Sequence, residues 1–145
     1  MRFALGILVG LVACSPDSPA ADLAALGEAC AAPGGLRPVG DAYEGADQGE
    51  HDPPEHLAFR ARRGCYRAFA VGGAGVGDLD VAFYDPEGHI AAGDVSRDRW
   101  PVVPPRGPLC VEREGVYTVA VSVARGRGSY LLQVWGTPRP DHASQ

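Results

Sequence analysis

Hydrophobic and polar residues alternate in several short stretches between Leu57 and Trp135, with the period of a strand that has one buried and one solvated face. The segment Asp85–Gly88, with the sequence DPEG, is typical of a β-turn between two such strands. A second turn is expected at Arg125–Gly128, where it would join two strands as a hairpin. The expected strands cover residues 57–61, 65–71, 79–84, 89–92, 109–111, 117–123 and 130–135.

Short strands of this kind, separated by turns, predict an all-β fold made of a single antiparallel β-sandwich or jelly-roll-like domain over residues 57–136. Within it, residues 96–108 are rich in proline and are expected to be irregular. The polar tail, residues 137–145, is expected to be disordered.

The chain before the sandwich, residues 22–56, is expected to contain a short helix and a flexible linker. The helix would cover residues 23–32, with Asp22 as its cap and the Pro-Gly-Gly segment 33–35 as its end. Residues 36–56 contain many carboxylates, and their glycines and prolines interrupt any regular element. This composition predicts a mobile, solvated acidic linker.

The first residues have the layout of an export signal. Arg2 supplies a positive charge, and Phe3–Ala13 is an apolar run that is shorter than the roughly 20 residues needed to span a bilayer. The run ends in Leu11-Val12-Ala13-Cys14, which resembles the bacterial lipobox. The resemblance implies a lipoprotein signal peptide over residues 1–13, cleavage before Cys14, and acyl chains on that cysteine that hold the protein to a membrane.

An ordinary secretory signal followed by a coincidental cysteine is the alternative. Ser15 follows the cysteine in place of Asp, which by resemblance to the enterobacterial sorting rule favours the outer membrane. Residues 14–21, which include two prolines, are expected to be a tether between the lipid and the helix. The expected location is therefore the cell envelope, with a lipid anchor.

The charge balance limits the partners. The chain has 13 basic residues, all of them arginine, and 18 acidic residues, which gives a net charge of −5. Nucleic-acid binding requires a basic face, so no nucleic-acid partner is expected. The expected partners are the membrane, through the lipid anchor, and an envelope protein or glycan.

The cysteines other than Cys14 are Cys30, Cys65 and Cys110, and export favours disulfide formation. Cys65 and Cys110 both lie in expected strands, so we predict that they pair; closing this loop stabilises the fold by roughly 4 kcal/mol in the chain-entropy model. Cys30 would then stay a thiol or join another molecule. The sequence leaves the two pairings that involve Cys30 open.

Three segments resemble the bacterial pre-peptidase C-terminal domain. They are DLDVAFYDPEG at Asp78–Gly88, EGVYTVAV at Glu114–Val121 and GSYLLQVW at Gly128–Trp135. The resemblance extends over residues 57–136 and implies a jelly roll. Domains of this family are usually appended to secreted proteases; some bind collagen or polysaccharide, and some collagen-binding members bind calcium.

Asp78, Asp80 and Asp85 are candidate calcium ligands, because calcium prefers several carboxylate oxygens on neighbouring loops. The alternative is that they are solvated surface and turn residues. Trp100 is a candidate ligand contact in the irregular segment, and the alternative is that it plugs the core and anchors the loop. No other cofactor is expected.

A catalytic site needs a nucleophile beside a base, or paired carboxylates in a cleft, and the sequence has no motif that supplies either. We therefore expect no enzymatic activity. The sequence predicts a lipid-anchored, non-catalytic structural or interaction protein of the cell envelope. The alternative is a calcium-stabilised module that binds carbohydrate or protein.

Overall fold

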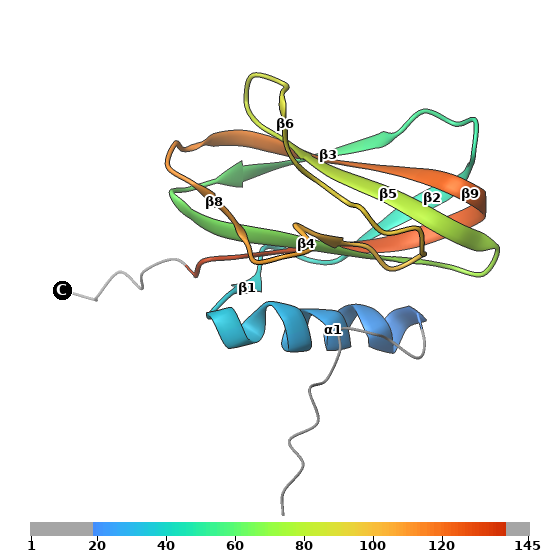
Figure 1. The fold of residues 1–145 in the computed structure, drawn as a ribbon, viewed down its shortest axis with the longest axis horizontal. Coiled ribbons are helices and arrows are strands. Elements are labelled where there is room, and N and C mark those ends of the chain that lie inside the picture. Colours follow the sequence, from blue (N-terminus) through green and yellow to red (C-terminus); the bar gives the residue numbers. More distant parts are fainter. Residues whose placement is uncertain (1–18, 139–145) are drawn as a thin grey trace, which may run out of the picture.

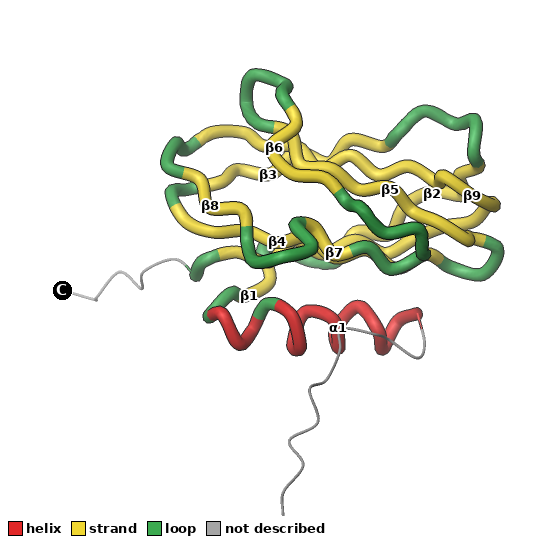
Figure 2. The backbone as a smooth tube through the Cα atoms, in the orientation of Figure 1, coloured by secondary structure: helices red, strands yellow, loops and turns green. Residues whose placement is uncertain are grey.

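In the computed structural model, which describes residues 19–138, the strands form one antiparallel sheet that folds over into two layers, with a helix outside one layer (Figures 1 and 2). The predicted all-β fold is therefore confirmed. The elements, in chain order, are α1 (Pro19–Cys30), the 3-10 helix η1 (Ala32–Gly34), β1 (Arg37–Pro38), β2 (Tyr43–Gly49), β3 (Glu55–Ala61), β4 (Gly64–Gly72), β5 (Val76–Tyr84), β6 (Ile90–Gly93), β7 (Val102–Val103), β8 (Leu109–Val111) and β9 (Gly115–Gly136).

The strand β9 is the longest and belongs to both layers. Its first half pairs with β3 on one edge and β5 on the other, so that Val119 lies opposite both Leu57 and Phe83. Its second half pairs with β2 and β4, and Leu132 lies opposite Ala70 of β4. The two layers are therefore β6-β5-β9-β3 and β2-β9-β4 with the short strands β1, β7 and β8 at its margins.

The hairpin predicted at Arg125–Gly128 is wrong, because the chain continues through this segment as part of β9. Gly126 has a φ of 90° and lies so close to the carbonyl of Gly75 that any side chain there would collide with it. The glycines of this segment therefore bend the strand from one layer into the other instead of reversing the chain.

The main core lies between the two layers, where alternate side chains of β3, β5 and β9 meet those of β4. Phe59 is partly buried and packs against this core, with ring centroids 5.5 Å from Tyr66 and 6.0 Å from Phe83. In β5 and β9 the side chains that lose all exposure are among those expected from the alternation: Leu79, Phe83, Val119 and Val121. The period of two in the sequence therefore identifies the inner face correctly.

A second core lies between α1 and the outer face of the β4 layer. Leu23 and Leu26 of the helix pack against Phe69 and Val71 of β4 and Trp135 of β9. Because β4 is buried on both faces, its sequence is apolar almost throughout and does not alternate. The predicted helix is confirmed and begins earlier than expected, at Pro19.

The acidic linker predicted for residues 36–56 is wrong, because β1 and β2 within it pair with β9. The buried residues of β2 are Gly45, Gln48 and Gly49, none of which is hydrophobic. Gly45 leaves room for the ring of Tyr130. Gln48 is 3 % exposed, donates to the Pro53 carbonyl at 2.7 Å and accepts from a β9 amide at 3.2 Å. The folded body therefore starts at α1 and includes most of the expected linker.

The carboxylate of Glu55 links the two layers at the edge where β2 and β3 run side by side. One of its oxygens accepts hydrogen bonds from the hydroxyls of Tyr43 at 2.8 Å and Tyr130 at 2.9 Å, and the other accepts from the Ala46 amide at 3.1 Å. Burial, followed by this hydrogen bond, raises the pKa of Tyr130 far above its ordinary value. The network therefore closes the edge of the sandwich with two tyrosine hydroxyls and a backbone amide that all donate to one carboxylate.

The predicted disulfide is confirmed: Cys65 of β4 and Cys110 of β8 lie opposite each other with Cα atoms 3.9 Å apart. None of the cysteines in the described residues is a free thiol, so the prediction that Cys30 stays a thiol is wrong. The Cys30 carbonyl, at the end of α1, accepts a hydrogen bond of 2.6 Å from the Arg67 guanidinium. This bond compensates for the lack of a basic residue in the last helical turn.

The contact between Gly27 and Trp135 predicts that a glycine-to-alanine replacement within α1 destabilises the protein, the opposite of its usual effect in a helix. Replacing glycine by alanine inside a helix ordinarily stabilises it by about 1 kcal/mol. A Cβ atom at Gly27, however, would collide with the indole of Trp135, which is 5 % exposed and cannot easily move aside. We therefore expect Gly27→Ala to lower the free energy of unfolding by about 1–3 kcal/mol, measured by urea denaturation of the full chain.

The matched control is Gly34→Ala, since no atom lies within 4 Å of the Cβ position at Gly34. This variant should change the free energy of unfolding by less than about 0.5 kcal/mol. A stabilised Gly27→Ala protein would mean that α1 does not rest on the indole as described.

Candidate functional site

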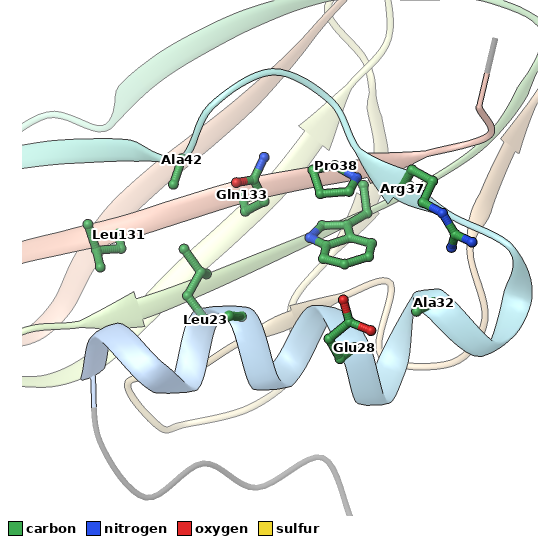
Figure 3. A pocket seen from close by; sticks show the side chains of 10 residues that line it. Leu23, Glu28, Ala32, Arg37, Pro38, Ala42, Leu131 and Gln133 are labelled. Carbon is green, nitrogen blue, oxygen red and sulfur yellow. The ribbon is translucent and has the colours of Figure 1, made fainter. Parts of the chain in front are cut away.

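A cleft of about 680 Å³ opens between α1 and the second half of β9 (Figure 3). We call it the helix cleft and define it by Leu23, Ala24, Glu28, Arg37, Leu131 and Trp135. Leu23 and Leu131 lie at one end, whereas Glu28 and Arg37 lie toward the other (Figure 3). The cleft is therefore apolar at one end and carries its charges at the other.

Trp135 lines the helix cleft, and its indole N–H group is buried without a hydrogen-bond partner among the described residues. The residue is 5 % exposed. Buried indole N–H groups usually find an acceptor. The ring is held rigidly, because it rests on Gly27 and meets Phe69 edge-on with centroids 6.4 Å apart.

A second cleft, of about 570 Å³, lies at the end of the sandwich where β1, the β3–β4 turn and the end of β9 meet. We call it the arginine cleft, because Arg37, Arg60, Arg62 and Arg63 line it; among residues 19–138, the carboxylate that lines it is that of Glu114. Arg63 pairs with exposed Glu112 at 3.1 Å, whereas the other three arginines have no ion-pair partner within residues 19–138. In a chain of net charge −5, this is a local concentration of positive charge.

The two clefts are neighbours, because Arg37 and Pro38 of β1 line both of them. The Arg37 guanidinium donates to the Leu36 carbonyl at 2.9 Å, which holds the side chain in place and leaves its other N–H groups available. An apolar surface and a cationic surface therefore meet at β1. The chemistry they can provide together is the binding of a molecule with an apolar body and an anionic end.

Of the three aspartates that were predicted to bind calcium, the structure separates Asp85 from Asp78 and Asp80. Asp78 and Asp80 lie on the outer face of β5, while Asp85 lies in the turn after it. Asp85 uses one carboxylate oxygen to accept from the amides of Glu87 and His89, both at 2.9 Å, which lowers its pKa. Asp85 is thus the turn residue of the alternative interpretation.

A different pair of carboxylates lies near Asp80. The segment after β6 runs along β5, with the Asp94 amide donating to the Val81 carbonyl at 2.9 Å and the Leu79 amide donating to the Asp98 carbonyl at 3.0 Å. Burial raises the pKa of Asp94, and the charges of Asp80 and Asp98 add to the effect. Burial, followed by the charge of Asp78, also raises the pKa of Asp80.

These carboxylates do not form a ready metal site. Among the described residues, no group of three or more His, Cys, Asp or Glu side chains is arranged to hold a metal ion. Two carboxylate oxygens, Asp78 Oδ1 and Asp94 Oδ2, are nevertheless buried without a hydrogen-bond partner. The group is therefore an electrostatically strained part of the surface.

Trp100 lies half-buried against the second core, as in the alternative that it anchors the irregular loop. Its amide donates to Asp98 at 3.0 Å, and the Arg99 guanidinium lies 5.5 Å from its ring centroid. It also borders a small cleft of about 230 Å³ together with Arg67. Its role as a ligand contact stays a prediction.

Cys14, the predicted lipidation site, lies outside the described residues. The sequence interpretation missed both clefts. Arg60 and Arg62 were visible as the outward positions of a strand, but only the fold places β1 beside them. Trp135 was recognisable as an aromatic residue of an expected strand, but only the docking of α1 turns its indole into the wall of a cleft.

The raised pKa values predict how the acidic group affects stability. Asp80 and Asp94 hold their protons more tightly in the folded chain, so their ionisation disfavours the folded state as the pH rises above the ordinary range of Asp. We expect Asp80→Asn to raise Tm by about 2 °C near pH 7 and to leave it unchanged near pH 3, where the carboxyl is protonated in both states. Asp41→Asn, at an exposed carboxylate of another loop, is the matched control; an equal rise there would contradict the explanation.

No protein-family model matches this chain, and no curated protein matches it either. Within residues 19–138, no helix has the length and apolar character needed to cross a membrane. The described residues form an antiparallel β-sandwich with one α-helix packed on it and two adjoining clefts, one mainly apolar and the other lined by arginines.

Proposed function

We propose that the protein is a lipid-anchored, non-catalytic interaction module of the bacterial cell envelope. The observation that carries this proposal is the segment Leu11-Val12-Ala13-Cys14 at the end of a short apolar run, directly ahead of a folded body. A lipobox in this position supplies an acylated cysteine, and two or three acyl chains make membrane attachment effectively permanent. By the sorting rule, Ser15 favours the outer membrane.

The fold changes the expected length of the tether. The stalk inferred from the sequence reached residue 56, but α1 begins at Pro19 and packs on the sandwich. Only residues 15–18 separate Cys14 from the folded body, and four residues span at most about 14 Å. The anchor would therefore hold the body close to the bilayer surface.

Binding fits the geometry better than catalysis does. The histidine in contact with a carboxylate is His89, whose Nδ1 lies 3.6 Å from Asp85 in an exposed turn. It lines neither the helix cleft nor the arginine cleft. The clefts offer an apolar wall and several guanidinium groups, which are suited to recognising a ligand.

A calcium-stabilised module that binds carbohydrate or protein is the second candidate. The observation in its favour is the pair of buried carboxylate oxygens, Asp78 Oδ1 and Asp94 Oδ2, that lack partners. A divalent cation would satisfy such oxygens and relieve the repulsion around Asp80.

The calcium candidate predicts a higher melting temperature in calcium than in chelator. With millimolar calcium, we expect a rise of several degrees in the native protein if the ion binds, and a smaller rise in Asp94→Asn, because bound ligand stabilises the folded state. Magnesium at the same concentration is the control for nonspecific screening. A melting temperature that is the same in calcium and in chelator would remove this candidate.

The anchor is tested by replacing Cys14 with serine in the full chain. We expect the protein with its native Cys14 to stay with the membrane fraction and to partition into detergent. The Cys14→Ser protein should move to the soluble fraction, because the serine hydroxyl cannot carry the diacylglyceryl group. Ser15→Ala is the neighbouring control and should stay with the membrane. Intact-mass measurement should show acyl chains only where Cys14 is present.

Peptide mapping without reduction supplies the contrary outcome. Cys65 and Cys110 are paired, so Cys14 and Cys30 are the remaining cysteines of the sequence. Acylation and a disulfide use the same sulfur atom of Cys14 and exclude each other. A mature protein with a Cys14–Cys30 bridge, or Cys14→Ser protein that stays in the membrane fraction, would refute the anchor.

A further inference from the structure

We propose that the helix cleft and the arginine cleft together form a binding site for an anionic phospholipid. An acyl chain would lie in the helix cleft, along the apolar wall of α1 and β9. The phosphate would lie in the arginine cleft, and the ester group would lie between them, near β1. The site belongs to the described residues and does not depend on the acylation of Cys14.

The helix cleft has the size and the lining that an acyl chain needs. Its volume of about 680 Å³ falls in the range of roughly 300–1,000 Å³ that is typical of small-molecule sites. Leu23 of α1 and Leu131 of β9 lie near each other at one end of it (Figure 3), and Ala24 and Trp135 also line it. Its polar residues include Glu28 and Arg37, which lie toward the end beside β1 (Figure 3). An apolar chain therefore fits with its end among the leucines.

The indole of Trp135 contributes its ring surface to this apolar cleft. Its Nε1 atom is buried against Gly27 of α1 and has no partner among the described residues. Because this atom has no accessible surface, a ligand in the cleft meets the carbon atoms of the ring and not its N–H group. The helix cleft therefore recognises the apolar chain, and the head group is recognised by the neighbouring arginine cleft.

The charge of the arginine cleft selects an anionic head group. Arg37, Arg60 and Arg62 have no ion-pair partners among the described residues, and guanidinium groups bind phosphate through paired hydrogen bonds. The opposing charges are Glu114 in this cleft and Glu28 at the neighbouring one, so positive charge predominates. Because Arg37 and Pro38 line both clefts, one molecule can reach both.

The experiment measures lipid binding to the full chain carrying Cys14→Ser, so that no covalent acyl chain competes. The probe is lysophosphatidylglycerol with an 18-carbon chain, below its micelle-forming concentration, followed by tryptophan fluorescence and native mass spectrometry. We expect saturable binding of one lipid, at least tenfold tighter than that of the zwitterionic lysophosphatidylcholine with the same chain. Oleate tests whether a fatty acid is the ligand instead.

Two pairs of variants separate the head-group site from the chain site. Arg60→Ala with Arg62→Ala should weaken lysophosphatidylglycerol binding at least tenfold and abolish the preference over lysophosphatidylcholine. Arg97→Ala with Arg106→Ala is the matched control, since these exposed arginines line neither cleft and should leave binding unchanged. Ala24→Trp fills the helix cleft and should abolish binding of both lysolipids. Ala25→Trp, at the next exposed position of α1, should not.

Three results would overturn the proposal. Equal affinity for the anionic and the zwitterionic lipid would remove the role of the arginine cleft. Undiminished binding by a folded Ala24→Trp protein would remove the helix cleft as the place of the chain. Tight binding of oleate with none of lysophosphatidylglycerol would replace the phospholipid by a fatty acid. Melting curves of every variant establish that a loss of binding is not a loss of folding.

Discussion

The structure depends on one continuous strand that is hydrogen-bonded on both edges in both layers. β9 pairs with β3 and β5 along its first half and with β2 and β4 along its second half. Its partners are far away in sequence, so most of the backbone hydrogen bonds form only when this last strand is in place. The inner face of β9 contributes side chains to the main core, and its outer face near Trp135 packs against α1. Both clefts adjoin its final residues, which ties the candidate site to the same constraint.

A sandwich made from one folded sheet must still be closed along the edge where the two layers are not paired through their backbones. Here side chains close it. Glu55 of β3 accepts from Tyr43 of β2 and Tyr130 of β9, and Gln48 connects the β2–β3 loop to β9. Buried polar groups are acceptable only when they are satisfied, and these are. The polar residues of this region suggest a linker in the sequence, but in the fold they form hydrogen bonds that join the two layers at this edge.

Sequence periodicity predicted the elements whose buried positions are hydrophobic. The strands around Phe59, Phe83 and Val119 were expected, and so was the pairing of Cys65 with Cys110. It failed where burial is achieved by glycine or by a satisfied polar group, as at Gly45 and Gln48 of β2. At Gly45 the ring of Tyr130 fills the space that a side chain would take, and Gln48 is satisfied by the Pro53 carbonyl. The sequence of β2 therefore shows no pattern of hydrophobic residues.

The segment Arg125–Gly128 failed for a related reason, because glycine is equally suited to a hairpin and to a strand that changes layer. Only the distant contact between Gly126 and Gly75 distinguishes the two, and local sequence does not contain it. The candidate site was hidden in the same way. Its walls come from α1, β1, β3 and β9, and no stretch of sequence brings these together. The sequence shows which side chains are apolar or charged, but only the long-range pairing of the strands brings those side chains together.

The geometry of α1 relates the proposed anchor to the proposed lipid site. A helix of twelve residues is about 18 Å long. α1 begins at Pro19, and β1, which contains Arg37, lies beside the other end of the helix (Figure 1). An end-on attachment would hold the arginine cleft away from the bilayer by the length of the helix. Lying with α1 along the surface, a body tethered by about 14 Å of chain would bring both clefts to the level of the head groups. An anionic membrane surface attracts the cationic arginine cleft and repels the remaining, mostly acidic surface of the protein. Both effects favour the orientation in which the cleft faces the membrane.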